Sequence, residues 1–121
     1  MQDKPLLGRH ILVIENDFFQ AEDCRHYLTQ AGGVIVACSG TIPDWEALLA
    51  SDRVDIALLD INLGHTHSFD LARALLSNDI PVVFLSGYSP EIVPPDLSHA
   101  PLITKSAEPA AVIEPLFNRI T

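Results

Sequence analysis

The sequence predicts a single α/β domain built on a doubly wound, five-stranded parallel sheet with helices on both faces. Five short apolar runs recur along the 121 residues, and none shows the polar alternation of a strand that faces water on one side. Segments with helical spacing separate these runs, which is typical of parallel sheets joined by right-handed crossovers. The common strand order in open sheets of this size is 2-1-3-4-5, the flavodoxin-like order, so we predict it here.

The predicted strands consist mainly of β-branched residues and leucine, so we expect them to be covered on both faces. They are ILVI (11–14), VIVA (34–37), IALL (56–59), VVFL (82–85) and LIT (102–104).

The first two helices follow the first two strands. Apolar residues recur every three or four positions from Phe18 to Ala31, with Cys24 and Leu28 among them, and a glycine pair, 32–33, then ends the helix. The second helix is short, from about residue 43 to 50, with Thr41 or Asp44 near its start.

The remaining helices are marked by a cap and by prolines. The third helix follows Ser68, a residue favoured at the N-cap, and buries three apolar side chains, Leu71, Ala72 and Leu75. Pro90 can open a fourth helix, which Pro94 ends about a turn later. The last helix runs from about Ser106 to Ile120, with a kink expected at Pro115.

The composition excludes several classes of protein. A net charge of −9, from 16 acidic and 7 basic residues, opposes binding to a nucleic-acid backbone, so we expect no direct nucleic-acid ligand. No apolar run reaches the 18 residues of a membrane helix, and the N-terminus does not read as a signal peptide. Cys24 and Cys38 form no CxxC spacing and are expected to be buried in a reduced, cytoplasmic protein.

Polar side chains stand where the predicted strands end, at the crevice where doubly wound sheets place their function. They are Glu15, Asn16 and Asp17 after the first strand, Asp60 and Asn62 at the third, Ser86 at the fourth and Lys105 at the fifth.

These residue types together favour a phosphoryl-transfer site. Acids from neighbouring strand tips repel each other unless a cation lies between them, and Mg²⁺ prefers such carboxylate and carbonyl oxygens. Lys105 supplies a second positive charge and Ser86 a hydroxyl, so charge on a phosphoryl group could be shared among them. The nucleotide loops GxxxxGK[ST] and GxGxxG are absent, so the phosphoryl group must arrive on a partner or small donor. Asp60 is the best acceptor, through an acyl phosphate.

The same segments, in this order, resemble the receiver domain of bacterial two-component response regulators. ILVIEND resembles its first strand and acidic pair, ALLDINLG its phosphoacceptor loop, VVFLSGY its switch hydroxyl and PLITKS its lysine. The resemblance covers residues 8 to 121, which implies one receiver domain over 1–121, with its core at about 8–121 and no output domain.

The resemblance also implies roles for individual residues. It makes Asp60 the site phosphorylated by a histidine kinase or a histidine phosphotransfer protein, with Ser86 and Lys105 meeting the phosphoryl group. It makes Glu15, Asn16, Asp60 and the backbone carbonyl of Asn62 the ligands of Mg²⁺. Such a domain switches a partner-binding face and is not a conventional enzyme, although it can lose its phosphoryl group by itself.

Three residues depart from the family's pattern. Asn16 stands where a second acid is common, so we expect weaker Mg²⁺ binding. Ser106 replaces a proline that follows a cis bond in the family, and such a bond costs more before a non-proline residue. Leu102 replaces a switch aromatic, which leaves the output partner and formation of a homodimer open.

Two other functions compete with this interpretation. Asn16 and Ser106 favour a phosphorylation-independent interaction module on the same fold. A small phosphatase of the haloacid dehalogenase type also uses Asp, Ser or Thr, Lys and Mg²⁺, but its DxD motif is expected on the first strand. His65, His67 and Asp70 could suggest a metal site, but two loop histidines without a third ligand are more often simply polar.

Overall fold

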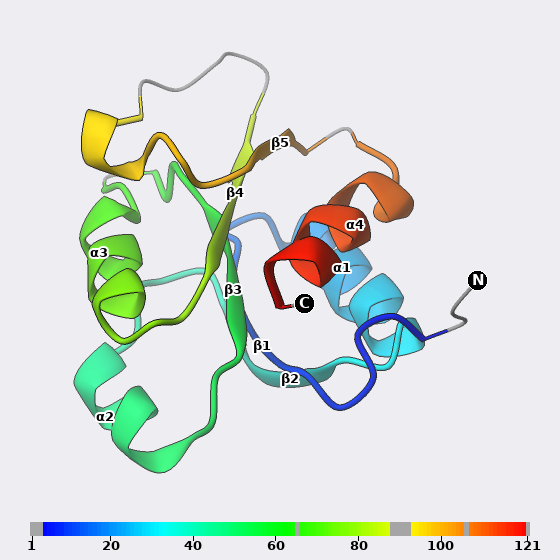
Figure 1. Ribbon diagram of the computed structural model, residues 1–121. Coiled ribbons are helices and arrows are strands. Elements are labelled where there is room, and N and C mark those ends of the chain that lie inside the picture. The colour runs from blue at the N-terminus through cyan, green and yellow to red at the C-terminus, as the bar shows by residue number, and fades with distance from the viewer. Residues whose placement is uncertain (1–3, 65, 88–92, 106, 121) are drawn as a thin grey trace.

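The computed structural model describes residues 4–64, 66–87, 93–105 and 107–120, and its core is one five-stranded sheet. The strands lie in the order β2-β1-β3-β4-β5, and every neighbouring pair is parallel. Figure 1 shows α2 and α3 on one face of this sheet and α1 and α4 on the other. The predicted doubly wound α/β fold and its strand order are confirmed.

The elements follow each other in strict alternation apart from one short 3₁₀ turn. They are β1 His10–Ile14, α1 Phe18–Gln30, β2 Val34–Ser39, α2 Trp45–Ser51, β3 Ile56–Asp60, α3 Phe69–Ser77, β4 Val82–Ser86, η1 Pro95–Leu97, β5 Leu102–Thr104 and α4 Pro109–Ile120. None of the described helices is long and apolar enough to cross a membrane.

The sheet divides the core into two apolar layers. Leu12, Leu59 and Phe84 belong to the layer beneath α2 and α3, whereas Val13 and Leu58 belong to the layer beneath α1 and α4. Successive side chains of a strand point to opposite faces, so the continuously apolar sequences of β1, β3 and β4 fill both layers. The central strands are therefore covered on both faces, as predicted.

The edge strands differ from that prediction. Val34 at the start of β2 and Leu102 at the start of β5 are 45% and 43% exposed. Each edge strand has a neighbour on one side only, and α2, which stands next to β2, contains no fully buried residue. Apolar composition alone could not distinguish these strands from the central ones.

Two further apolar residues are more exposed than the sequence pattern suggested, and for Cys38 the expected burial is wrong. Phe18 is 69% exposed, because it stands in the first turn of α1 and stacks edge to face on Phe19 instead of on the sheet. Cys24 is buried as expected, but Cys38 is exposed because it lies on the edge strand β2.

The later helices agree with prediction in part. Leu71, Ala72 and Leu75 of α3 are buried, and Ser68 takes the N-cap position, although its hydroxyl makes no capping hydrogen bond. The last helix begins at Pro109 instead of Ser106, because proline needs no N–H partner in a first turn. Pro115 lies within it, and the kink there stays a prediction. The expected short helix at Pro90 falls largely on residues 88–92, outside the described residues.

Candidate functional site

Three charged side chains meet at the carboxyl end of the sheet. The ammonium Nζ of Lys105 donates to Glu15 Oε1 at 2.7 Å and to Asp60 Oδ2 at 2.8 Å. The side chains of Glu15 and Asp60 are 0% and 2% exposed, and the side chain of Lys105 is 20% exposed. A single cation therefore joins two buried anions that come from different strand ends.

The register of the sheet brings these residues together. Ile14 pairs with Leu59, so the next residues along β1 and β3, Glu15 and Asp60, follow side by side. The backbone N–H of Lys105 donates to the carbonyl of Ser86 at 2.8 Å. This bond joins Lys105, the first residue after β5, to the last residue of β4. Lys105 and Ser86 therefore lie at the carboxyl end of the sheet, together with Glu15 and Asp60.

The carboxylate of Glu15 is only half satisfied. Its Oε1 accepts from Lys105 Nζ and from the backbone N–H of Asp17, whereas its buried Oε2 has no hydrogen-bond partner. Burial raises the pKa of Glu15 even against the neighbouring ammonium. Burial alone would lower the pKa of Lys105, but the hydrogen bonds to Asp60 and Glu15 raise it, so Lys105 is charged at neutral pH.

The backbone of Asn62 also faces Asp60. Its N–H donates to Asp60 Oδ1 at 3.3 Å. Asn62 forms an antiparallel bridge with His67, and the hydrogen bonds of that bridge run between the flanking residues, from Leu63 to Thr66 and from Ser68 to Ile61. The bridge itself therefore uses neither the N–H of Asn62, which donates to Asp60, nor its carbonyl.

The amino-acid sequence of the chain is similar to parts of known regulatory proteins. No protein-family model matches the chain. It is 30% identical over 90 residues to "Regulatory protein VirG" of Agrobacterium fabrum, which is 71% of this chain and 35% of that protein. It is also 30% identical over 80 residues to the VirG protein of Rhizobium rhizogenes, covering 65% of this chain and 33% of that protein. The chain thus spans about a third of the length of these relatives.

Solved structures match almost the whole chain. The non-phosphorylated HemR receiver domain from Leptospira biflexa has a TM-score of 0.75 and 24% identity, over 94% of this chain and 95% of that one. A response regulator receiver protein from Burkholderia phymatum has a TM-score of 0.76 and 19% identity, over 93% and 95%. The chain is a response regulator receiver domain. It is of the type used in two-component signalling, as its strand-end residues had indicated.

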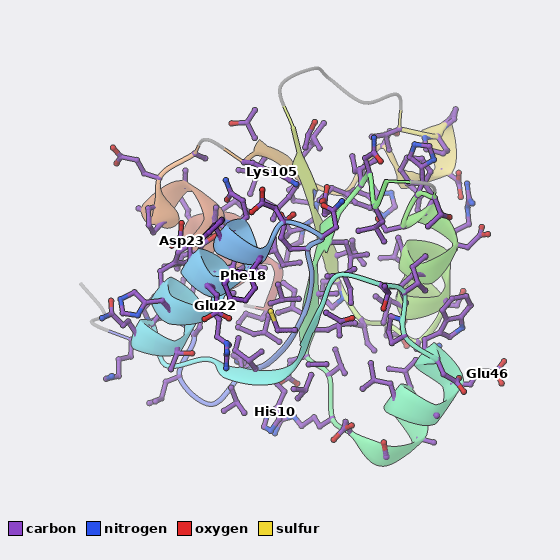
Figure 2. The ribbon with its side chains drawn as sticks, turned by 180° about the vertical axis from the view of Figure 1, so that it is seen from behind. His10, Phe18, Glu22, Asp23, Glu46 and Lys105 are labelled. Carbon is purple, nitrogen blue, oxygen red and sulfur yellow. The ribbon has the colours of Figure 1, made fainter. Side chains whose placement is uncertain are left out.

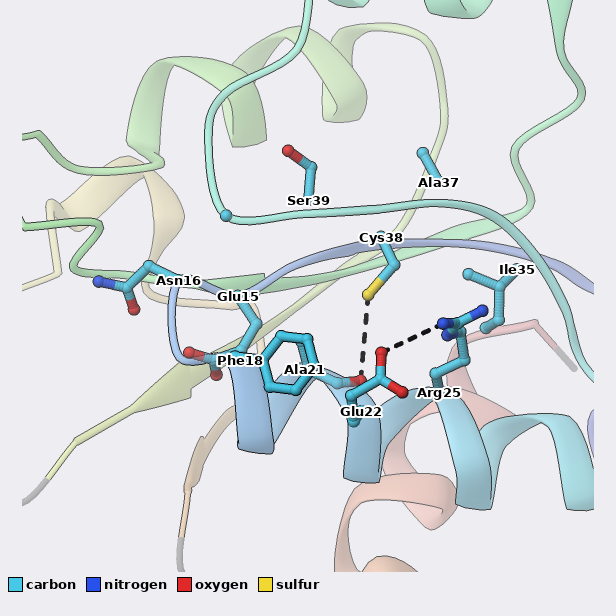
Figure 3. Close-up of a pocket in the computed structure, with 11 residues that line it drawn as sticks. Glu15, Asn16, Phe18, Ala21, Glu22, Arg25, Ile35, Ala37, Cys38 and Ser39 are labelled. Atoms are coloured by element: carbon cyan, nitrogen blue, oxygen red, sulfur yellow. Dashed lines mark hydrogen bonds and ion pairs between the residues drawn. The ribbon is translucent and has the colours of Figure 1, made fainter.

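The side chains of Asn16 and Asp17 in this receiver domain lie apart from the pair of acids that Lys105 joins. Asp17 Oδ1 caps α1 by accepting from the backbone N–H groups of Phe19 and Gln20, so this oxygen is occupied. Asn16 is exposed and lines a groove of about 460 Å³ between α1 and β2. Figure 3 shows Asn16, Glu15 and Phe18 at one end of this groove, with Arg25 at the other.

A second groove of the receiver domain, about 630 Å³, lies between α1 and α4 and includes Lys105 in its lining. Figure 2 shows Lys105 near the first turn of α1, which carries Phe18, and far from His10 at the other end of the sheet. Glu15 therefore lines the first groove and Lys105 the second, and Asp60 lines neither of them.

The donor set suits a hard divalent cation, the ion that receiver domains typically bind. Glu15 Oε2 is an unpartnered carboxylate oxygen beside Asp60, and the Asn62 carbonyl is not used by its bridge. These are oxygen ligands of the kind that Mg²⁺ takes, with water completing its shell. Among the described residues, no cluster of three or more His, Cys, Asp or Glu could hold a metal, so any site here depends on carbonyl, amide or water oxygens as well.

Some sequence expectations are not tested by this geometry. Two residues singled out in the sequence, His65 and Ser106, lie outside the described residues, and so does the Lys105–Ser106 bond. His67 is described, and its ring stacks on Phe69 with centroids 5.3 Å apart. Sequence reasoning missed both this stack and the cap at Asp17, although an acid directly before a helix is a known capping signal.

Proposed function

We propose that this receiver domain, with its core at about residues 8–121, accepts a phosphoryl group on Asp60 from a histidine kinase or a histidine phosphotransfer protein. The observation that supports this most is the bridge of Lys105 Nζ between the two buried carboxylates, together with the unpartnered Oε2 of Glu15. Both oxygens of Asp60 accept a hydrogen bond, Oδ2 from Lys105 Nζ and Oδ1 from the backbone N–H of Asn62, which fixes the orientation of this carboxylate.

The reaction transfers a phosphoryl group between two side chains. An oxygen of the Asp60 carboxylate attacks phosphorus, the P–N bond to the donor's imidazole breaks, and the imidazole leaves with a proton. The ammonium of Lys105 stabilises the negative charge that develops on the phosphoryl oxygens. Asp60 pairs with Leu85 in the sheet, so Ser86, the next residue of β4, lies one position beyond it. The product is an acyl phosphate on Asp60.

Magnesium would be held by Glu15, Asp60, the Asn62 carbonyl and, with its amide oxygen, Asn16. When bound, the ion neutralises phosphoryl oxygens and orients them for in-line attack. Because Asn16 brings no charge, the affinity for Mg²⁺ would be lower than with two acids at these positions. Phosphorylation adds about 1.5 to 2 negative charges, and the change at Ser86 and Lys105 would shift a partner-binding face.

The test is covalent phosphorylation by a small donor. Incubation with acetyl phosphate and Mg²⁺, followed by intact mass measurement, should show one added phosphoryl group in the wild type. The Asp60→Asn variant should show none, and Asp55→Asn, which changes an acid at the opposite end of β3, should behave as the wild type. An absence of any adduct in the wild type, with acetyl phosphate or with a phosphorylated phosphotransfer protein, contradicts the proposal.

A phosphorylation-independent interaction module is the second candidate. It is favoured by the fact that Lys105 already pairs with both acids while Asn16 adds no charge. The same experiment separates the two, because such a module would not bind beryllofluoride with Mg²⁺ and would give no adduct. The phosphatase alternative has less support, since Asp60 ends the third strand and not the first.

A further inference from the structure

Two short arms, residues 61–64 and 66–68, connect β3 to α3, and the first of them carries Asn62. Backbone hydrogen bonds from Leu63 to the carbonyl of Thr66, at 2.9 Å, and from Ser68 to that of Ile61, at 3.1 Å, join the two arms. Gly64, with φ of 96°, ends the first arm. The outgoing arm is anchored at Ile61 and Leu63, which are 0% and 5% exposed.

The return arm is held differently, by a ladder of three aromatic rings. The imidazole of His67 lies flat against the ring of Phe69, at 5.3 Å and 5° between planes. Phe69 meets Phe84 edge to face at 6.0 Å. Phe84 is fully buried in β4, two residues before Ser86, so the ladder connects an exposed loop residue to a rigid central strand.

The ladder and the bridge act on the same residue. His67 is directly opposite Asn62 in the antiparallel bridge, so fixing His67 fixes the position of Asn62. The side-chain Oδ1 of Asn62 is already used by the N–H of Gly64 at 2.9 Å, and its own N–H by Asp60. Among the described residues, none donates a hydrogen bond to the Asn62 carbonyl, and the direction of that carbonyl depends on the return arm.

We propose that His67 and Phe69 are positioning residues, which hold the loop so that the Asn62 carbonyl is set beside Asp60. The part that concerns Mg²⁺ rests on the proposed function above, whereas the part that concerns loop order does not. The ring of His67 acts through its flat face, so another flat aromatic ring should replace it.

The first experiment measures amide hydrogen exchange at Leu63 and Ser68, whose N–H groups close the loop. In His67→Ala, both amides should exchange about 3- to 10-fold faster, as expected for the loss of one aromatic pair. In His67→Phe, exchange should return to within about twofold of the wild type, because the stack is kept. Phe19→Ala, which removes a ring from the exposed Phe18–Phe19 pair, should leave both amides unchanged.

Two results would overturn the inference. Unchanged exchange in His67→Ala shows that the bridge holds without the stack. Equally fast exchange in His67→Ala and His67→Phe shows that the imidazole acts through its nitrogens or that the site tolerates no change. Global unfolding monitored in parallel separates a local effect from lost stability, because His67 is exposed and its removal should change the unfolding midpoint little.

The second experiment is a calorimetric Mg²⁺ titration of the same variants. Affinity should fall about 3- to 10-fold in His67→Ala and recover in His67→Phe, in step with exchange. If the wild type binds no Mg²⁺ while the exchange pattern holds, the proposed function fails and the positioning role of His67 stands. If the wild type binds Mg²⁺ and His67→Ala binds it equally well, the positioning role fails and the proposed function stands.

Discussion

Strands β1 and β3 lie side by side, and each end of this pair holds an acidic side chain next to a base. At the amino end, Asp55 Oδ2 accepts from the backbone N–H of His10 at 2.7 Å, and its Oδ1 accepts from Arg53 Nε at 2.9 Å. At the carboxyl end, Glu15 shares Lys105 with Asp60 and keeps one buried oxygen without a partner. Both oxygens of Asp55 accept hydrogen bonds, whereas one oxygen of Glu15 does not, although His10 Nδ1 at the amino end also lacks a hydrogen-bond partner.

The pKa shifts of the two acids run in opposite directions. Burial would raise the pKa of Asp55, but the hydrogen bonds from His10 and Arg53 outweigh it and lower that pKa. Burial of Glu15 outweighs the help of Lys105 and raises its pKa. The amino-end acid is therefore satisfied by the fold, whereas the carboxyl-end acid remains able to take a further positive charge.

The largest expected effect comes from removing the base at each end. Lys105→Met leaves Glu15 and Asp60 buried without a cation and should lower the free energy of unfolding by about 3 kcal/mol. Arg53→Met should change it by less than about 1 kcal/mol, since Arg53 is 61% exposed. Urea unfolding of both variants at neutral pH measures the difference. Equal losses would mean that the two ends do not differ in the way described.

Removing one acid at each end should give effects of opposite sign. Glu15→Gln keeps the volume of the side chain and removes a buried charge, so it should be neutral or stabilising by at most about 1 kcal/mol. Asp55→Asn leaves Arg53 and the His10 N–H with a weaker acceptor and should cost about 1 kcal/mol. The same unfolding assay applies, and a clear destabilisation by Glu15→Gln would contradict the view that burial of this charge is only partly offset by Lys105.

Adding an acid at the carboxyl end should sharpen the contrast further. Asn16→Asp should tighten Mg²⁺ binding about tenfold. This change corresponds to about 1.4 kcal/mol, which is part of the roughly 4 kcal/mol gross attraction of two opposite charges in contact in a crevice. It should also speed phosphorylation by acetyl phosphate. Gln30→Glu makes the same charge change at the far end of α1 and serves as the control. If Asn16→Asp alters neither property, the amide of Asn16 is not at the metal.

The smallest effect is in the pH dependence of stability. A buried acid with a raised pKa binds more protons when folded, so Glu15 should lower the free energy of unfolding as pH rises from the ordinary glutamate pKa through its raised one. Asp55, with a lowered pKa, contributes stability above its unfolded pKa that is lost as pH falls through its folded pKa. Comparing Glu15→Gln and Asp55→Asn with the wild type across acidic pH should show these opposite trends.

The sequence predicted the sheet and its polar end because both depend on patterns that are local or general. Continuous apolar runs identify buried parallel strands, and the end at which they converge follows from the topology. Cys38 was placed wrongly, and the exposure of Phe18 was not foreseen, because helical spacing and apolar character do not show where a helix passes the sheet edge or which strand is outermost. The bridge of Lys105 to Asp60 and Glu15 joins residues 45 and 90 positions apart, so its distances follow only from the folded register.

The most direct test of this account is a Mg²⁺ titration by calorimetry on three proteins, the wild type, Glu15→Gln and Asp55→Asn. If the unpartnered oxygen of Glu15 receives the ion, Glu15→Gln should weaken binding by about tenfold or more, as the loss of a contacting charge requires. Asp55→Asn, which alters a carboxylate with both oxygens hydrogen-bonded at the other end of the same strands, should bind as the wild type does. Equal affinity in the wild type and Glu15→Gln would contradict the account.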